Sequence, residues 1–134
     1  MAQRLNISSG TKWEETVGYS RAVRVGDIVV VGGTVAVDEK GSLVGAGDMY
    51  AQARFIFVKI ERAHREAGAT FADVVSTRIF VTDVSRWEEA GRAHAEIFAK
   101  IRPTCTLVEV KGLVKPEFLV EIEVMAIAGE GDRA

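Results

Sequence analysis

Cysteine, proline and long apolar runs are all scarce in this chain of 134 residues. With one cysteine an internal disulfide is excluded, and a lone thiol fits a reducing compartment. No apolar stretch reaches the length that spans a membrane, and the opening MAQRLNISSG lacks the apolar segment of a signal peptide. We therefore expect a cytoplasmic protein with no membrane partner.

An excess of charge of either sign is also missing. The chain has 17 basic and 19 acidic side chains, a formal charge of −2, and no long run of either sign, which gives no reason to expect a nucleic-acid partner. Apolar residues make up 48% and charged residues 27%, as in ordinary globular proteins. The length suits a single domain over residues 1–134, large enough to bury a core.

Alternating polarity and turn residues predict strands along most of the chain. We expect them at 5–7, 19–25, 28–32, 74–81, 104–110 and 119–127. Gly26-Asp27 suits a two-residue hairpin turn, a second hairpin is expected over 34–44, and 13–18 is expected to be a loop.

Two segments have helical periodicity. The first, 48–67, has Asp48 as a candidate N-cap and Gly68 as a candidate C-terminal stop. Its apolar stripe consists of Met49, Ala53, Ile56, Ile60, Ala63 and Ala67. The second runs from about Ser85, in a capping box with Glu88, to about residue 101.

This order predicts an α+β fold: a mainly antiparallel sheet with two helices on one face. The strands are apolar on both faces, so the face without helices needs a cover, and we expect the chain to oligomerise.

Metal and cofactor signatures are missing. There is no H-x-x-x-H, C-x-x-C or carboxylate cluster with metal spacing, and the glycine pairs lack the ending of a phosphate loop. We predict no metal and no cofactor. His94 lies on the apolar stripe of the second helix and is expected in the core, whereas His64 is expected on a solvent-facing flank of the first helix.

The C-terminal third carries a family resemblance. Arg-Pro-x-x-Thr and Val-Glu-Val from Arg102 onward, then Val-Glu-Ile-Glu-x-x-Ala, resemble the Rid/YjgF/YER057c/UK114 family (L-PSP, RidA-like reactive intermediate deaminases). The likeness extends upstream through 18–20, 32–34, 67–69 and 81–83, so it covers about 18 to 128. It implies a chorismate-mutase-like fold, a homotrimer with clefts between subunits, and hydrolysis of imines or enamines.

The resemblance also implies site residues. Glu121 matches a glutamate that orients or activates water, and Tyr19 matches a tyrosine of the cleft. Cys105 stands where such deaminases have an arginine that grips the substrate carboxylate, and Gly32 stands where they have a serine. We expect Leu107 to line the same cleft.

Four arginines are candidates to replace the missing clamp: Arg21, Arg24, Arg78 and Arg102. We favour Arg102, which is beside Pro103 and near the cleft strand.

Ordinary structural roles stay open for these residues. Cys105 can be a small packed side chain, Glu121 can pair with a basic residue, and Tyr19 can be an interface residue. The sequence therefore supports a RidA-like hydrolase that is not a standard 2-iminobutanoate deaminase, with a non-catalytic trimer that binds a small molecule as the alternative. Ribonuclease activity, attached to some relatives, is disfavoured because no basic surface with aromatic residues is evident.

Overall fold

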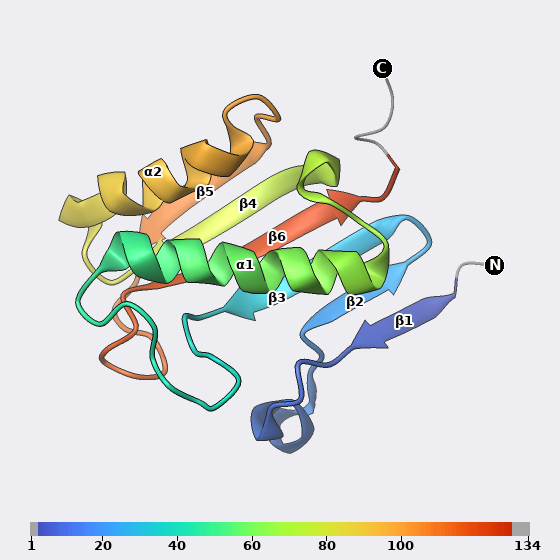
Figure 1. Ribbon diagram of the computed structural model, residues 1–134, viewed down its shortest axis with the longest axis horizontal. Helices are drawn as coiled ribbons and strands as arrows, with labels where there is room; N and C mark the ends of the chain where they lie inside the picture. The colour runs from blue at the N-terminus through green and yellow to red at the C-terminus, as the bar shows by residue number, and fades with distance from the viewer. Residues whose placement is uncertain (1–2, 130–134) are drawn as a thin grey trace.

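The protein is described by a computed structural model over residues 3–129. Six strands form one sheet in the order β1-β2-β3-β6-β4-β5, and helices α1 and α2 lie on the same face of it (Figure 1). Every neighbouring pair is antiparallel except β4 and β5, which are parallel. The predicted α+β class is confirmed. The elements are β1 Arg4–Ile7, η1 Glu14–Gly18, β2 Ala22–Val25, β3 Ile28–Thr34, α1 Met49–Ala67, η2 Phe71–Asp73, β4 Val74–Val81, η3 Val84–Arg86, α2 Trp87–Phe98, β5 Thr104–Glu109 and β6 Val120–Ile127.

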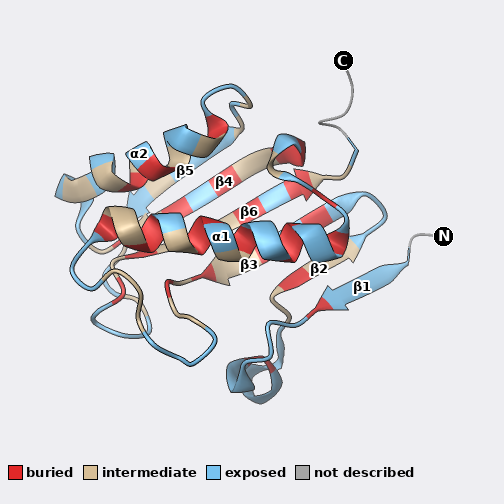
Figure 2. Ribbon diagram, viewed as in Figure 1, coloured by how far each residue is buried: buried red, intermediate tan, exposed pale blue. Residues whose placement is uncertain are grey.

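The core lies between the sheet and α1. The predicted apolar stripe of α1 is buried along its whole length, and Figure 2 shows it as repeated red bands. The helix begins as expected, because the Asp48 side chain accepts a hydrogen bond from the Ala51 N–H at 2.9 Å. It ends at Gly68, whose φ of 81° is the left-handed conformation that glycine adopts at little cost.

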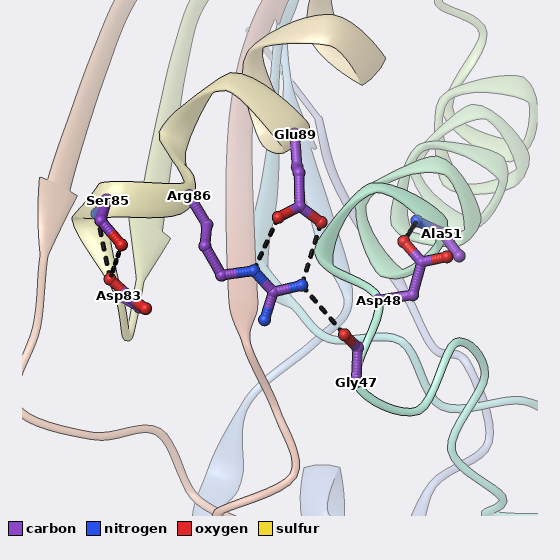
Figure 3. A network of polar contacts seen from close by, with 7 residues as sticks. All are labelled: Gly47, Asp48, Ala51, Asp83, Ser85, Arg86 and Glu89. Carbon is purple, nitrogen blue, oxygen red and sulfur yellow. Dashed lines mark hydrogen bonds and ion pairs between the residues drawn. The ribbon is translucent and has the colours of Figure 1, made fainter.

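Helix α2 begins differently from the prediction. A 3-10 turn, η3, precedes it, and the cap of that turn is Asp83: its carboxylate accepts from the Ser85 N–H at 3.0 Å and from the Ser85 hydroxyl at 2.6 Å. The Ser85–Glu88 capping box is therefore wrong. Figure 3 shows how Arg86 then ties this end of α2 to the loop before α1, by donating to Glu89 and to the Gly47 carbonyl at 2.9 Å.

Of two connecting segments, one differs from expectation and one agrees with it. Residues 14–18 form a short π-helix and not a loop, closed by the Tyr19 N–H donating to the Glu14 carbonyl at 3.0 Å. The segment 34–44 is hairpin-like as expected, although too short for strands: the antiparallel bridge between Val37 and Leu43 lies beside the Asp38 N–H donating to the Ser42 carbonyl at 2.9 Å.

The two histidines are both inside. His94 is half-buried, 4.6 Å from the ring centroid of Phe98, and hydrogen-bonds the Thr77 hydroxyl at 2.9 Å. The core placement of His94 fits these contacts. His64 is fully buried, so the expected solvent-facing position is wrong. It follows Ile60 by four residues and so continues the buried side of α1.

Candidate functional site

The two faces of the sheet differ in what covers them. We call the face under the helices the covered face and the opposite one the open face. The apolar end of the open face is the cluster Val23, Val25, Ile28, Val30, Met125 and Ile127, of which Val25, Ile28, Val30 and Met125 are exposed. Its polar end follows the bulge where the β3–β6 register shifts between Val31 and Thr34.

Two glycines shape this bulge. A Cβ on Gly33 would collide with the carboxylate of Glu121, and a Cβ on Gly32 would lie 3.3 Å from Nη2 of Arg21. The glycines therefore let an acidic and a basic side chain lie directly against the backbone of β3, which is a common reason for glycine in a strand.

Arg21 is held in place across the bulge. Its Nη2 donates to the Gly33 carbonyl at 2.6 Å, and its guanidinium carbon lies 5.7 Å from the centroid of the Tyr19 ring. Its Nε is buried and has no hydrogen-bond partner among the described residues. Arg21 lies at a bend directly before β2, and its contact with the Tyr19 ring places the two side chains side by side.

Glu121 is half-buried at this end of β6. Burial raises the pKa of its carboxyl above the ordinary value, nearby Arg21 lowers this pKa, and Glu123 raises it. Glu123 itself pairs with Arg78 at 2.9 Å, whereas Glu121 makes no ion pair within the described part of the chain. A partly buried carboxyl with a raised pKa and without an ion-pair partner is a candidate for proton transfer.

Lys59 of α1 is a second partly buried cation near the end of β3. Its Nζ donates to the Val35 carbonyl at 2.7 Å. Burial, and then the charge of Arg21, lower the pKa of Lys59 to about 8, while Asp38 opposes this shift. The end of β3 is thus flanked by two partly buried cations.

Tyr19 also borders a surface hollow. The hollow has a volume of about 560 Å³ and is lined by Arg4, Asn6, Glu14, Gly18, Tyr19, Ser20 and Val23. Glu121 does not line it. In a single copy of the chain, Tyr19 therefore borders the hollow and also lies beside Arg21, the neighbour of Glu121. The single copy encloses neither the hollow nor these two side chains.

The predicted site residues fall into two groups. Tyr19, Gly32 and Glu121 come together on the open face. Cys105 and Leu107 are in register with Thr77 and Ile79 of β4, so they point to the covered face of the edge strand β5. Cys105 is exposed there, and Leu107 packs against the core.

The favoured clamp residue, Arg102, belongs to neither group. It is exposed between α2 and β5 with a φ of 57°. Arg24 and Arg78 already have partners within the chain: Arg24 donates to the Ala67 carbonyl, and Arg78 pairs with Glu123. Arg21 alone among the four candidates lies beside Glu121.

Among residues 3–129, no group of three or more His, Cys, Asp or Glu side chains is arranged to hold a metal ion. Over the same residues, no helix is long and apolar enough to cross a membrane.

Comparison with known proteins gives a consistent result. The family model described as Endoribonuclease L-PSP matches residues 11–128. An uncharacterised protein of Streptomyces coelicolor is 39% identical over 94% of this chain and 93% of its own length. The 3-aminoacrylate deaminase RutC of Acinetobacter baylyi is 35% identical over 81% of this chain and 85% of its own length. A crystal structure of a YjgF/YER057c/UK114 family member from Mycobacterium tuberculosis is 50% identical, covers 94% of this chain and all of that one, and superposes with a TM-score of 0.85.

Proposed function

This chain belongs to the Rid/YjgF/YER057c/UK114 (L-PSP) family, and on that premise we propose that it is a RidA-like hydrolase of imine or enamine metabolites. The observation that carries the proposal is Glu121: a half-buried carboxyl with a raised pKa, held against a glycine bulge beside an arginine. The name of the Acinetobacter relative, a 3-aminoacrylate deaminase, supports the reaction class, because an enamine becomes an imine by moving one proton.

Hydrolysis of an imine needs one side chain that accepts and donates a proton. Water adds to the imine carbon while the ionised Glu121 takes a proton from that water, and the nitrogen receives a proton. The resulting carbinolamine loses ammonia as its C–N bond breaks and the C=O bond forms. Water and imine thereby give a carbonyl compound and ammonia, with no oxidant or reductant. A carboxyl whose pKa burial has raised toward the working pH is a better partner for both proton transfers than an exposed one.

We place the reaction in clefts between the subunits of a homotrimer. The apolar end of the open face needs a cover, and a second copy of the chain supplies one. The position of Cys105 gives a second reason. Cys105 points to the covered face of β5, and Glu121 points to the open face of β6 with β4 in between, so only residues of two different copies can meet in one cleft.

The alternative is a non-catalytic trimer that binds a small molecule. It is favoured by the two replaced positions, Cys105 and Gly32, which offer a cleft fewer polar groups than an arginine and a serine. A standard α-imino acid would lose the two parallel hydrogen bonds that an arginine gives a carboxylate.

The deciding experiment is hydrolysis of 2-iminobutanoate generated in the cuvette, with a competing trap for the free imine. Turnover by the wild type would mean that another group has taken over the role of the missing arginine. Glu121→Gln should then lose about 100-fold or more of this activity, and Glu123→Gln, the matched change two residues along the same strand, should change it little. Turnover by Cys105→Arg alone would mean a scaffold retuned to another ligand. If wild type and Cys105→Arg were both inactive, the hydrolase proposal would fail and the binding alternative would stand.

A further inference from the structure

Arg21 differs from every other arginine in the described part of the chain. Three arginines are partly buried: Arg21, Arg24 and Arg86. Arg24 pairs with Asp27 at 3.5 Å and Arg86 pairs with Glu89 at 2.6 Å, whereas Arg21 has no carboxylate within ion-pair distance. A cation that has lost part of its water without gaining a counterion costs free energy, and an anion that arrives beside it recovers part of that cost.

The guanidinium is also positioned in advance. Nη2 is fixed on the Gly33 carbonyl at 2.6 Å, the Tyr19 ring flanks the group, and Gly32 leaves the space in which it lies. The buried Nε has no hydrogen-bond acceptor among the described residues. Of the two nitrogens Nε and Nη2, only Nη2 is therefore hydrogen-bonded to the protein. A side chain that is ordered before binding loses less entropy when it takes a ligand.

The surroundings of Arg21 do not repel an anion. Lys59, the other partly buried cation near the end of β3, interacts electrostatically with Arg21, and Asp38 is the acidic group that opposes this effect at Lys59. Glu123 is already paired with Arg78. The three cations balance the three carboxyls of Asp38, Glu121 and Glu123 even when all of them are ionised, so the site carries no net negative charge.

We propose that Arg21 determines the specificity of this site, and that its guanidinium binds the carboxylate of a small anionic substrate whose C=N carbon then lies at Glu121. The role that Cys105 cannot fill thus falls to a residue directly before β2. This inference rests on the proposed function for its reaction, but not for its binding step.

Binding is tested without catalysis, using 2-oxobutanoate as the anionic probe and 2-oxobutanamide as its neutral counterpart in calorimetric titrations. We expect wild type to bind the anion more tightly than the amide by about tenfold or more, as for a hydrogen bond to a charged group. Arg21→Gln should remove this preference while the affinity for the amide changes less than about twofold, and Arg21→Lys should retain part of it. Arg92→Gln is the matched control, since Arg92 also has no ion pair within the described part of the chain but is exposed on α2 over the Tyr50 ring.

Each outcome decides something. Equal affinities of wild type for the two probes, or a preference that survives in Arg21→Gln, would overturn the role of Arg21. A preference lost in Arg102→Gln instead would assign the clamp to that arginine. Imine hydrolysis by a wild type without anion preference would leave the proposed function standing and this inference rejected. Anion binding that depends on Arg21, without hydrolysis of 2-iminobutanoate, would support the role of Arg21 and reject the proposed function. A thermal melt of each variant identifies a fold defect, and Arg21→Lys then carries the test.

Discussion

The covered and open faces of the sheet treat polar groups in opposite ways. On the covered face, polar side chains are sealed in: Thr77 is buried and bonded to His94, and His64 of the overlying helix is fully buried. On the open face, Arg21 and Glu121 are only partly buried and are not paired with each other within 4 Å. Because side chains alternate along a strand, neighbouring residues of β6 serve the two purposes in turn. The covered face therefore contributes most of the buried core, whereas the proposed reaction lies on the open face.

The sharpest way to separate the two faces is Gly33→Ala. The new methyl group would collide with the Glu121 carboxylate, so this side chain must leave its place over the bulge. We expect a loss of about 100-fold or more in imine hydrolysis, with only a small change in melting temperature, because a side chain on the open face can move. The control is Gly112→Ala, where a Cβ meets nothing within 4 Å. Equal activity of the two variants would show that the position of Glu121 does not matter.

A second change tests what covers the open face. Val30 is 44% exposed opposite Met125, in the middle of the apolar end. If copies of the chain pack through this face, Val30→Glu places a charge in that interface and should reduce the particle mass from three chains to one chain of 14.5 kDa in light scattering. Val58→Glu, at a 54% exposed position on α1, should leave the mass unchanged. A wild type that is already monomeric would remove the trimer from the proposal.

The buried histidine above the covered face should make the free energy of unfolding depend on pH. Burial lowers the pKa of His64 from 6.5 to about 4, against an opposing effect of Asp73, and neither ring nitrogen has a hydrogen-bond partner among residues 3–129. The folded state therefore favours neutral His64. The resulting stability is complete above pH 6.5 and is lost as the pH falls toward 4, by about 3 kcal/mol at most.

The measurement is urea unfolding of wild type and His64→Leu from pH 7 to pH 4.5. Leucine fills a similar volume without nitrogens to protonate, so the variant should gain on the wild type as the pH falls. Parallel curves would mean that His64 does not titrate on unfolding in this range. Other groups titrate equally in both proteins and cancel in the difference.

Most of the fold followed from the sequence, because period-two and helical patterns fix elements one at a time. Val74–Val81 was predicted to the residue, and the first helix was predicted with both ends. His64 was misplaced because the buried side of α1 is wider than the stripe of six residues suggested. The start of α2 was missed because the 3-10 turn η3, capped by Asp83, precedes the helix and includes Ser85.

The site was less predictable than the fold. Alternation shows which residues of one strand share a face, but it does not show which residues of another strand lie on the same side of the sheet. Cys105 and Glu121 are expected in one cleft between subunits. Within one copy, the parallel register of β5 with β4 turns Cys105 to the covered face, whereas Glu121 lies on the open face. Arg21 was among the four arginines named as candidates, but it lies at a bend directly before β2, where alternation does not fix the direction of its side chain. Its closeness to Glu121 additionally depends on the bulge at Gly32 and Gly33, and neither glycine specifies a register shift by itself.

The smallest expected effect comes from the second carboxylate of the open face. Glu123 shares strand and face with Glu121, but it pairs with Arg78, whose side chain is 59% exposed. Exposed ion pairs contribute little, so Glu123→Gln and Arg78→Gln should each change the free energy of unfolding by less than about 1 kcal/mol. Glu123 also raises the pKa of Glu121, so Glu123→Gln should shift the acidic limb of the pH–rate profile slightly to lower pH, which pH-dependent kcat/KM measures. If Glu123→Gln instead lost as much activity as Glu121→Gln, both carboxylates would take part in the reaction. The ion pair of Glu123 with Arg78 would then not separate its role from that of Glu121.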